Sequence, residues 1–156
     1  MILPLELTDA QALAQIHKTC FPDGWSEAAF YGLLHDSTSV GWKILDQKEN
    51  IAGFILARII TDEGEILTIA VHPSYQRQGL GSRLVQALQI FSEEVLVKKL
   101  HLEVAVDNVS AIALYNGSGF DRTGFRPDYY KNSNHESTSA YIMSWAPKTL
   151  PEQNYS

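Results

Sequence analysis

Cysteine is almost absent from this chain of 156 residues, which contains only Cys20. A single thiol cannot form an internal disulfide framework, so a packed core has to hold the fold, and the chain is long enough to bury one. Reducing compartments suit such a sequence, and we expect a cytoplasmic protein. The five histidines show no metal-ligand spacing, so we expect no metal site.

Clustered basic residues and long apolar runs are also missing. Twelve Lys and Arg residues are scattered among eighteen Asp and Glu residues, for a net charge of −6, which is unlike a nucleic-acid-binding surface. The longest apolar stretch, at 51–60, is too short to span a bilayer and includes Arg58. The first residues, MILPLEL, lack a basic leader. We therefore expect neither nucleic-acid binding nor membrane insertion.

No repeat, low-complexity tract or interior linker divides the chain. We expect one domain over residues 1–146, followed by a polar tail over 147–156.

Hydrophobic periodicity and turn signals predict a mixture of helices and strands. A strand, a long helix and another strand follow one another over 65–106 and form a crossover unit, so the two strands are expected to be parallel neighbours. The runs at 39–45 and 51–60 flank the polar turn DQKEN and are expected to form an antiparallel hairpin. The fold class is therefore α/β with a mixed sheet. The predicted helices are 9–20 (capped by Thr8), 27–35 (capped by Ser26), 80–97 and 110–120, and the predicted strands are 39–45, 51–60, 65–71, 99–106 and 138–145.

The stretch QRQGLGSRL places Gly79 and Gly81 at the expected start of the long helix. First-turn amides have no intrahelical partner, and the helix dipole adds positive potential, so a start left bare of side chains is suited to an anion. A tight turn with a flexible helix start explains the glycines equally well. The stretch is not a nucleoside-triphosphate loop, because Ser82 and Arg83 replace the required Lys-Ser/Thr, nor a dinucleotide fingerprint, because Leu84 replaces the third glycine.

The longer string VHPSYQRQGLG resembles the Gln/Arg-x-x-Gly-x-Gly/Ala signature of the GCN5-related N-acetyltransferase (GNAT) family, in Gln76, Gly79 and Gly81. Asn108, Ala111 and the segment LYNGSGF resemble a second motif of that family, N-x-x-A-x-x-L-Y-x-x-x-G-F. Within the family, the segments FPDGWSEAAF, LEV and RPDYY are similar to the bacterial enzymes that acetylate the N-terminal alanine of a small-subunit ribosomal protein.

The resemblance implies a GNAT-type acyl-CoA N-acyltransferase fold, with a mixed, mostly antiparallel sheet, a splayed parallel strand pair and about four flanking helices. It also implies acetyl-CoA as the co-substrate, with the pantetheine arm between the splayed strands and the pyrophosphate on the amides at the helix start. The implied contacts to the coenzyme are Ile69, Ala70, Val71, Arg77, Gln78, Gly79, Leu80, Gly81, Ser82 and Asn108.

Two residues are candidates for proton transfer. Alternation in KLHLEVAV places Glu103 in mid-strand on the face opposite the leucines, so this carboxylate must either face a wet cleft or have a structural partner. The resemblance implies that Glu103 is the general base. The spacing of Tyr115 by itself favours core packing, whereas the resemblance implies that its phenol gives a proton to the coenzyme sulfur.

The acceptor is expected to lie between the segments FPDGWSEAAF and RPDYYKNSNHES. Trp25, Tyr129 and Tyr130 are candidate peptide contacts there, or else ordinary aromatic packing. The chain departs from the similar enzymes in two places. Ala105 stands where they commonly have an arginine, and a Thr-Ser pair at 138–139 stands where they commonly have two acidic residues.

The sequence thus predicts direct transfer of acetyl from acetyl-CoA to an N-terminal amine, with a small-subunit ribosomal protein as the expected partner. Alternatives are a lysine or small-molecule amine as acceptor, a covalent relay through Cys20, and a noncatalytic acyl-CoA-binding module of the same fold. A small buried thiol is the simpler interpretation of Cys20, which lies on the apolar face of the first predicted helix. The presence of Glu103 together with Tyr115 argues against a noncatalytic module.

Overall fold

The computed structural model describes residues 1–131 and 137–148. Most of the predicted polar tail, 149–156, lies outside the described residues. The elements in chain order are β1 Ile2–Pro4, η1 Leu7–Asp9, α1 Ala10–Cys20, α2 Glu27–His35, β2 Ser39–Leu45, β3 Ile51–Ile60, β4 Glu63–Val71, η2 Pro73–Tyr75, α3 Leu80–Glu94, β5 Lys99–Ala105, α4 Val109–Gly117, β6 Asp121–Lys131 and β7 Ser137–Trp145.

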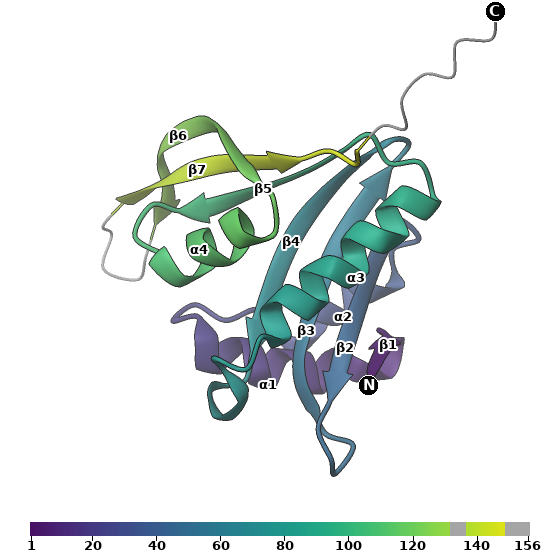
Figure 1. Ribbon diagram of the computed structural model, residues 1–156. Helices are drawn as coiled ribbons and strands as arrows, with labels where there is room; N and C mark the ends of the chain where they lie inside the picture. Colours follow the sequence, from purple (N-terminus) through teal and green to yellow (C-terminus); the bar gives the residue numbers. More distant parts are fainter. Residues whose placement is uncertain (132–136, 149–156) are drawn as a thin grey trace, which may run out of the picture.

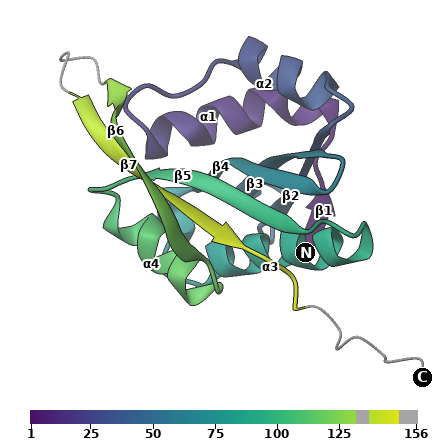
Figure 2. The same ribbon diagram turned by 90° about the horizontal axis from the view of Figure 1, so that it is seen from above.

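A seven-stranded sheet in the order β1-β2-β3-β4-β5-β7-β6 forms the centre of the molecule. Helices α1 and α2 cover one face, and α3 and α4 cover the other (Figure 1, Figure 2). Every neighbouring pair is antiparallel except β4 and β5, which are parallel. The predicted fold class, the hairpin and the parallel pair are therefore confirmed.

Several element ends differ from the sequence prediction, and helix α4 ends at Gly117, three residues before the predicted 120. Thr8 does not cap α1, because a 3-10 turn precedes the helix and the Glu6 amide donates to Asp9 Oδ2 at 2.7 Å. Helix α3 ends at Glu94, three residues early, since Leu96 adopts a positive φ of 62°. Strand β4 begins at Glu63 because the preceding turn is made at Thr61, with φ of 60°. Ser26 caps α2 as predicted, accepting from the Ala29 amide at 3.1 Å.

An extra residue in β4 separates it from β5. In the β3–β4 ladder Leu56 pairs with Thr68, but Ala57 pairs with Ile66, so Leu67 is bulged out of the register. The parallel β4–β5 ladder runs only from Glu63 to Glu65 and stops just before this bulge. Because a bulge bends its strand and increases the local twist, β4 turns away from β5 over its remaining length. This is the splayed pair that the family resemblance implied.

Two apolar clusters fill the spaces between the helices and the sheet. The cluster on the α3 and α4 face takes the inward side chains of β5, which are Leu100, Leu102 and Val104. The cluster on the α1 and α2 face contains Phe30 and Phe54. Alternate β5 residues therefore point away from the α3 face, which places Glu103 on the side of the sheet that carries α1 and α2.

A buried ion pair fixes the start of α1 to the sheet. The Lys43 ammonium on β2 lies 2.9 and 2.8 Å from the two carboxylate oxygens of Asp9, and these side chains are only 10% and 11% exposed. Burying two charges is costly unless both are paired. The pair therefore tolerates the loss of neither partner.

We expect K43A to lower the free energy of unfolding by about 3–5 kcal/mol, because Asp9 would stay buried without its cation. Urea denaturation followed by circular dichroism measures this loss. K98A is the matched control, since Lys98 pairs with Asp62 at 3.3 Å but is 80% exposed, and it should cost about 0.5 kcal/mol. Equal losses in the two variants would contradict a special role for the buried pair.

Among the described residues, no helix combines the length and apolar character needed to cross a membrane.

Candidate active site

The gap beside β4 exposes part of its backbone. The His72 amide donates to the Ala52 carbonyl of β3, so by alternation Ala70 also turns its backbone groups toward β3. Ile69 and Val71 turn theirs toward the gap. The Val71 carbonyl already accepts from Gln76 Nε2 at 3.0 Å and from the Cys20 thiol at 3.3 Å. Of the three predicted β4 contacts, Ile69 and Val71 thus offer backbone groups on the required side.

The start of α3 lies at the end of β4 and carries unused donors. Gly79 is the N-cap, with φ of 77°, and Arg77 also has a positive φ of 65°. Within the described part of the chain, the backbone amides of residues 77–82 donate no hydrogen bond to another protein group. Six adjacent free donors at the positive end of a 15-residue helix suit an anion. This arrangement fits the predicted diphosphate site.

Gly79 and Gly81 serve different purposes. A Cβ on Gly79 would meet nothing within 4 Å, so this glycine is required by its backbone angle. A Cβ on Gly81 would lie 3.2 Å from a methyl group of Leu114, on α4. The second glycine therefore lets α3 approach α4 closely, a packing role that the sequence did not indicate.

Helix α4 holds the two candidates of the second motif. Asn108 caps it, with Oδ1 accepting from the Ala111 amide at 3.2 Å. Tyr115 is 5% exposed and its ring lies 5.6 Å from that of Phe120. The core packing that its spacing favoured is confirmed, and its role as an acid stays a prediction. Tyr115 belongs to the cluster on the α3 face, opposite Glu103.

Glu103 has a structural partner, which was one of the two possibilities left open. Its side chain is 18% exposed, and Oε1 lies 2.9 Å from a guanidinium nitrogen of Arg126, on β6. Hydrogen bonding to Glu103, together with partial burial, raises the pKa of the Tyr129 phenol. Tyr129 thus lies beside Glu103 and its role as a peptide contact stays a prediction, whereas the side chain of Tyr130 lies outside the described residues. Sequence reasoning missed Arg126, although it singled out the segment RPDYY.

His17 anchors the loop that follows α1. Its Nδ1 accepts from the Trp25 amide at 3.0 Å, and its Nε2 lies 3.0 Å from the hydroxyl of Thr68, next to the β4 bulge. The ring stacks on Phe21 and Trp25, with centroids 4.4 and 4.9 Å away. Burial lowers the pKa of His17 to about 4. The imidazole is therefore neutral and donates to Thr68, a connection that sequence reasoning also missed.

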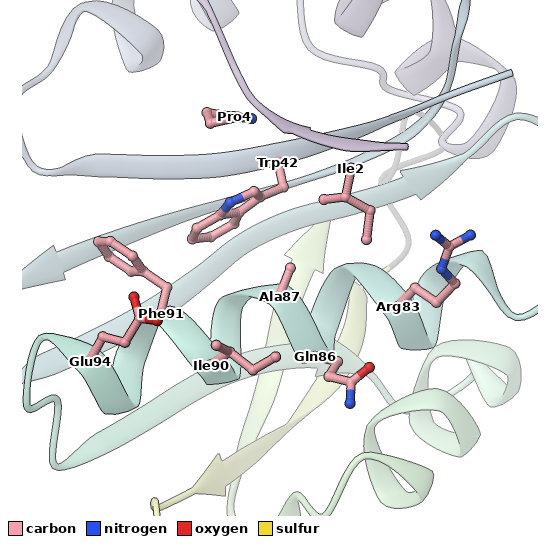
Figure 3. Close-up of a pocket in the computed structure, with 9 residues that line it drawn as sticks. All are labelled: Ile2, Pro4, Trp42, Arg83, Gln86, Ala87, Ile90, Phe91 and Glu94. Carbon is pink, nitrogen blue, oxygen red and sulfur yellow. The ribbon is translucent and has the colours of Figure 1, made fainter.

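Two surface hollows are lined in part by α3. One, of about 360 Å³, separates α3 from the β1–β2 edge, and Figure 3 shows Ile2 and Trp42 facing Ala87 and Phe91 across it. The other, of about 560 Å³, adjoins the α3 start at Gln78 and is walled by the β2–β3 turn. Neither contains Glu103 or Tyr115. The described residues hold no cluster of three or more metal-ligating side chains.

We expect stability to fall in mild acid because of His17. Its pKa is 6.5 in the unfolded chain and about 4 in the folded protein, so the unfolded state takes up the proton first as the pH falls. The contribution of His17 to the free energy of unfolding is therefore fully present above pH 6.5. It decreases toward pH 4, by up to roughly 3 kcal/mol.

Urea denaturation of wild type and H17Q at several pH values tests this expectation. The stability difference between the two should be largest at pH 7 and shrink toward pH 4. H35Q, which removes an imidazole at the exposed end of α2, is the control variant. A wild-type advantage over H17Q that stays constant with pH would refute the assignment.

Comparison with known proteins agrees with this geometry. The model of the acetyltransferase (GNAT) family matches residues 10–120. The chain is 36% identical over 133 residues to the [ribosomal protein bS18]-alanine N-acetyltransferase of Escherichia coli K12, covering 83% of this chain and 86% of the relative. It is 34% identical over 152 residues to the N-alpha-acetyltransferase RimI of Mycobacterium tuberculosis, covering 89% and 87%.

A solved structure is similar over almost the whole chain. The crystal structure of the ribosomal-protein-S18-alanine N-acetyltransferase from Escherichia coli superposes with a TM-score of 0.89 at 32% identity, covering 99% of this chain and 98% of the other. The expected family, fold and enzyme class are confirmed. This chain belongs to the GNAT family of acetyltransferases.

Proposed function

We propose that this enzyme transfers the acetyl group of acetyl-CoA directly to the N-terminal α-amine of a protein, and that its acceptor is an alanine-terminated small-subunit ribosomal protein. The separation of β4 from β5 after the Leu67 bulge carries the proposal. It leaves the two strands unpaired beyond Glu65, with amides that donate no hydrogen bond to another described residue at one end of the gap and a carboxylate on the neighbouring strand. The names of the similar enzymes support the choice of acceptor.

Acetyl-CoA would be held at its diphosphate and along its pantetheine arm. The amides of residues 77–82 suit the diphosphate, and the gap-facing backbone of Ile69 and Val71 suits the amides of the pantetheine arm. Asn108 uses its carbonyl oxygen to cap α4, and its side-chain NH₂ group is a further donor for the coenzyme. These contacts would direct the thioester into the opening.

The chemistry requires a base and an acid on different sides of the thioester. An α-amine with a pKa near 8 is only about one tenth neutral at pH 7, so a base must remove its proton before attack. Glu103 lies on the α1 face and Tyr115 in the cluster on the α3 face. An opening through the sheet lets groups from opposite faces reach one thioester. We assign Glu103 as the base and Tyr115 as the acid for the departing thiolate.

The charges around the opening favour a cationic acceptor. Glu65 and His101 are opposite each other in the β4–β5 ladder, on the same face as Glu103. Two carboxylates on adjacent strands attract the ammonium form of an amine. A lysine side chain has the same charge, but its amine near pKa 10.4 is far less often neutral at pH 7. The α-amine is therefore the better substrate for a single carboxylate base.

We expect E103Q and Y115F each to lower kcat/KM for acetyl transfer by roughly 10²–10⁴-fold, because each removes a positioned proton-transfer group. Thiol release from acetyl-CoA, measured with an alanine-terminated peptide, checks this. E94Q removes a carboxylate at the far end of α3 and should behave as wild type. Thermal stabilisation by acetyl-CoA without thiol release, across varied peptides, would favour a noncatalytic module instead.

Mass spectrometry of paired peptides tests the acceptor. One peptide has a free N-terminal alanine and no lysine, and the other has a blocked N-terminus and an internal lysine. We expect acetylation of the first only. Acetylation of the second alone would assign the enzyme to lysine side chains.

We expect G81A to weaken acetyl-CoA binding by about tenfold, because the added Cβ would press on Leu114 and shift α4 from the α3 start. Isothermal titration calorimetry measures the loss, and L114A in the same chain should restore most of the affinity. G32A is the control, since a Cβ there would meet nothing within 4 Å. An unchanged affinity in G81A would separate this glycine from the coenzyme site.

A further inference from the structure

Arg126 covers the carboxylate that we assign as the base. Its guanidinium lies 2.9 Å from Glu103 Oε1, and its side chain is 52% exposed, against 18% for Glu103. The guanidinium carbon also lies 4.7 Å from the centroid of the Tyr129 ring. Two side chains of β6, Arg126 and Tyr129, therefore lie against Glu103, and the charged one is half exposed.

The strand register explains how Arg126 reaches this position. Arg126 pairs with Ala140 on β7, and Ala140 pairs with Ala105 on β5. Since β5 residues alternate, Ala105 lies on the same face as Glu103. Only the methyl group of Ala140 therefore lies between Arg126 and β5 in this row, and the β5 residue at its end is also an alanine, which leaves room for the long side chain of Arg126 to cross β7.

An irregular stretch of β6 brings Tyr129 to the same place. Arg126 and Tyr130 are four positions apart, whereas their partners on β7, Ala140 and Thr138, are only two apart, so the strand bulges between them. Asp128 has a positive φ of 52°, and its amide donates to the Ser139 hydroxyl at 3.2 Å. Bulges of this kind redirect side chains. The Arg126–Tyr129 cover is therefore built into the strand.

The acceptor must approach the same carboxylate. If Glu103 takes a proton from an α-ammonium group, that cation needs to lie within hydrogen-bond distance of the carboxylate. A guanidinium already 2.9 Å away repels a second cation at short range. Arginine stays protonated at every pH at which the enzyme works, so it cannot itself react with the thioester. It is suited to hold the position without being modified.

We propose that Arg126 is a specificity-determining residue, whose guanidinium occupies the acceptor-ammonium position beside Glu103 in the free enzyme and is displaced by the substrate. The inference rests on the proposed function, since it takes Glu103 as the base. Displacement exchanges one cation for another at Glu103, so the carboxylate is paired before and after binding. An amine that brings no further contacts does not replace the guanidinium, whereas a peptide with additional contacts does.

R126Q tests the competition. Without the resident cation, we expect KM for the alanine-terminated peptide to fall about five- to tenfold and the discrimination against small amines to decrease. R122Q is the matched control, because Arg122 is also on β6 but lies over the Tyr141 ring, 3.6 Å from its centroid. An unchanged or higher KM in R126Q would overturn the proposal.

R126K tests the position directly, because it places a primary amine where the guanidinium lies. Incubated with acetyl-CoA and no peptide, this variant should acetylate itself at position 126. The thioester C–S bond breaks as the amide C–N bond forms, one ammonium proton passes to Glu103, and the second proton lost by the nitrogen balances the one gained by the coenzyme thiolate. R122K and the double variant E103Q/R126K should remain unmodified at the introduced lysine.

Intact mass and peptide mapping test the position of Arg126 independently of the proposed acceptor. Acetylation at position 126 that depends on Glu103 supports the placement, even if every peptide is refused and the proposed acceptor is wrong. If wild type acetylates the alanine peptide but R126K gains nothing at position 126, the proposed function stands and the resident-cation proposal is overturned.

Discussion

The candidate site depends on one extra residue in the fourth strand. Leu67 has no place in the β3–β4 register, and the parallel ladder with β5 ends two residues before it. Had β4 continued regularly, its edge would pair with β5 as far as Ile69, opposite Ala105, and the sheet would be closed. The bulge instead leaves the backbone of Ile69 and Val71 facing an opening, at the mouth of which α3 begins. The proposed coenzyme site and the proposed access to the thioester both depend on that one irregularity.

The bulge is fixed from the α1 side of the sheet. Thr68, directly after Leu67, is buried and hydrogen-bonded to His17, which also accepts from the Trp25 amide. The same imidazole therefore holds the loop after α1 and the strand beside the opening. Because burial keeps His17 neutral, it serves as donor on one side and acceptor on the other at neutral pH. One side chain thus joins the loop after α1, which is expected to contact the acceptor, to β4, which is expected to contact the coenzyme.

Features set within a short segment were predictable, and features set between distant segments were not. The periodicity of α3 and the alternation of β5 are local, and they placed Gly79 at the helix start and Glu103 on the correct face. Strand β6 was missed because Gly124, Pro127 and several charged residues break its alternation, as is usual for an edge strand. The Glu103–Arg126 pair and the His17–Thr68 bond join residues 23 and 51 positions apart, and they depend on register shifts that the sequence does not display.

The pairing of Glu103 shows what a carboxylate in the middle of a sheet requires. A largely buried carboxylate without a partner costs several kcal/mol, so a free enzyme that left it bare would lose stability. A lysine as partner would present a reactive amine to the thioester, whereas an arginine pairs with the carboxylate and is inert to acylation. The small side chains of Ala105 and Ala140 are what let this arginine come from the edge strand, where it is half exposed and has room to withdraw. If the substrate displaces Arg126 as proposed, the same ion pair stabilises the free enzyme and still gives the acceptor access to Glu103.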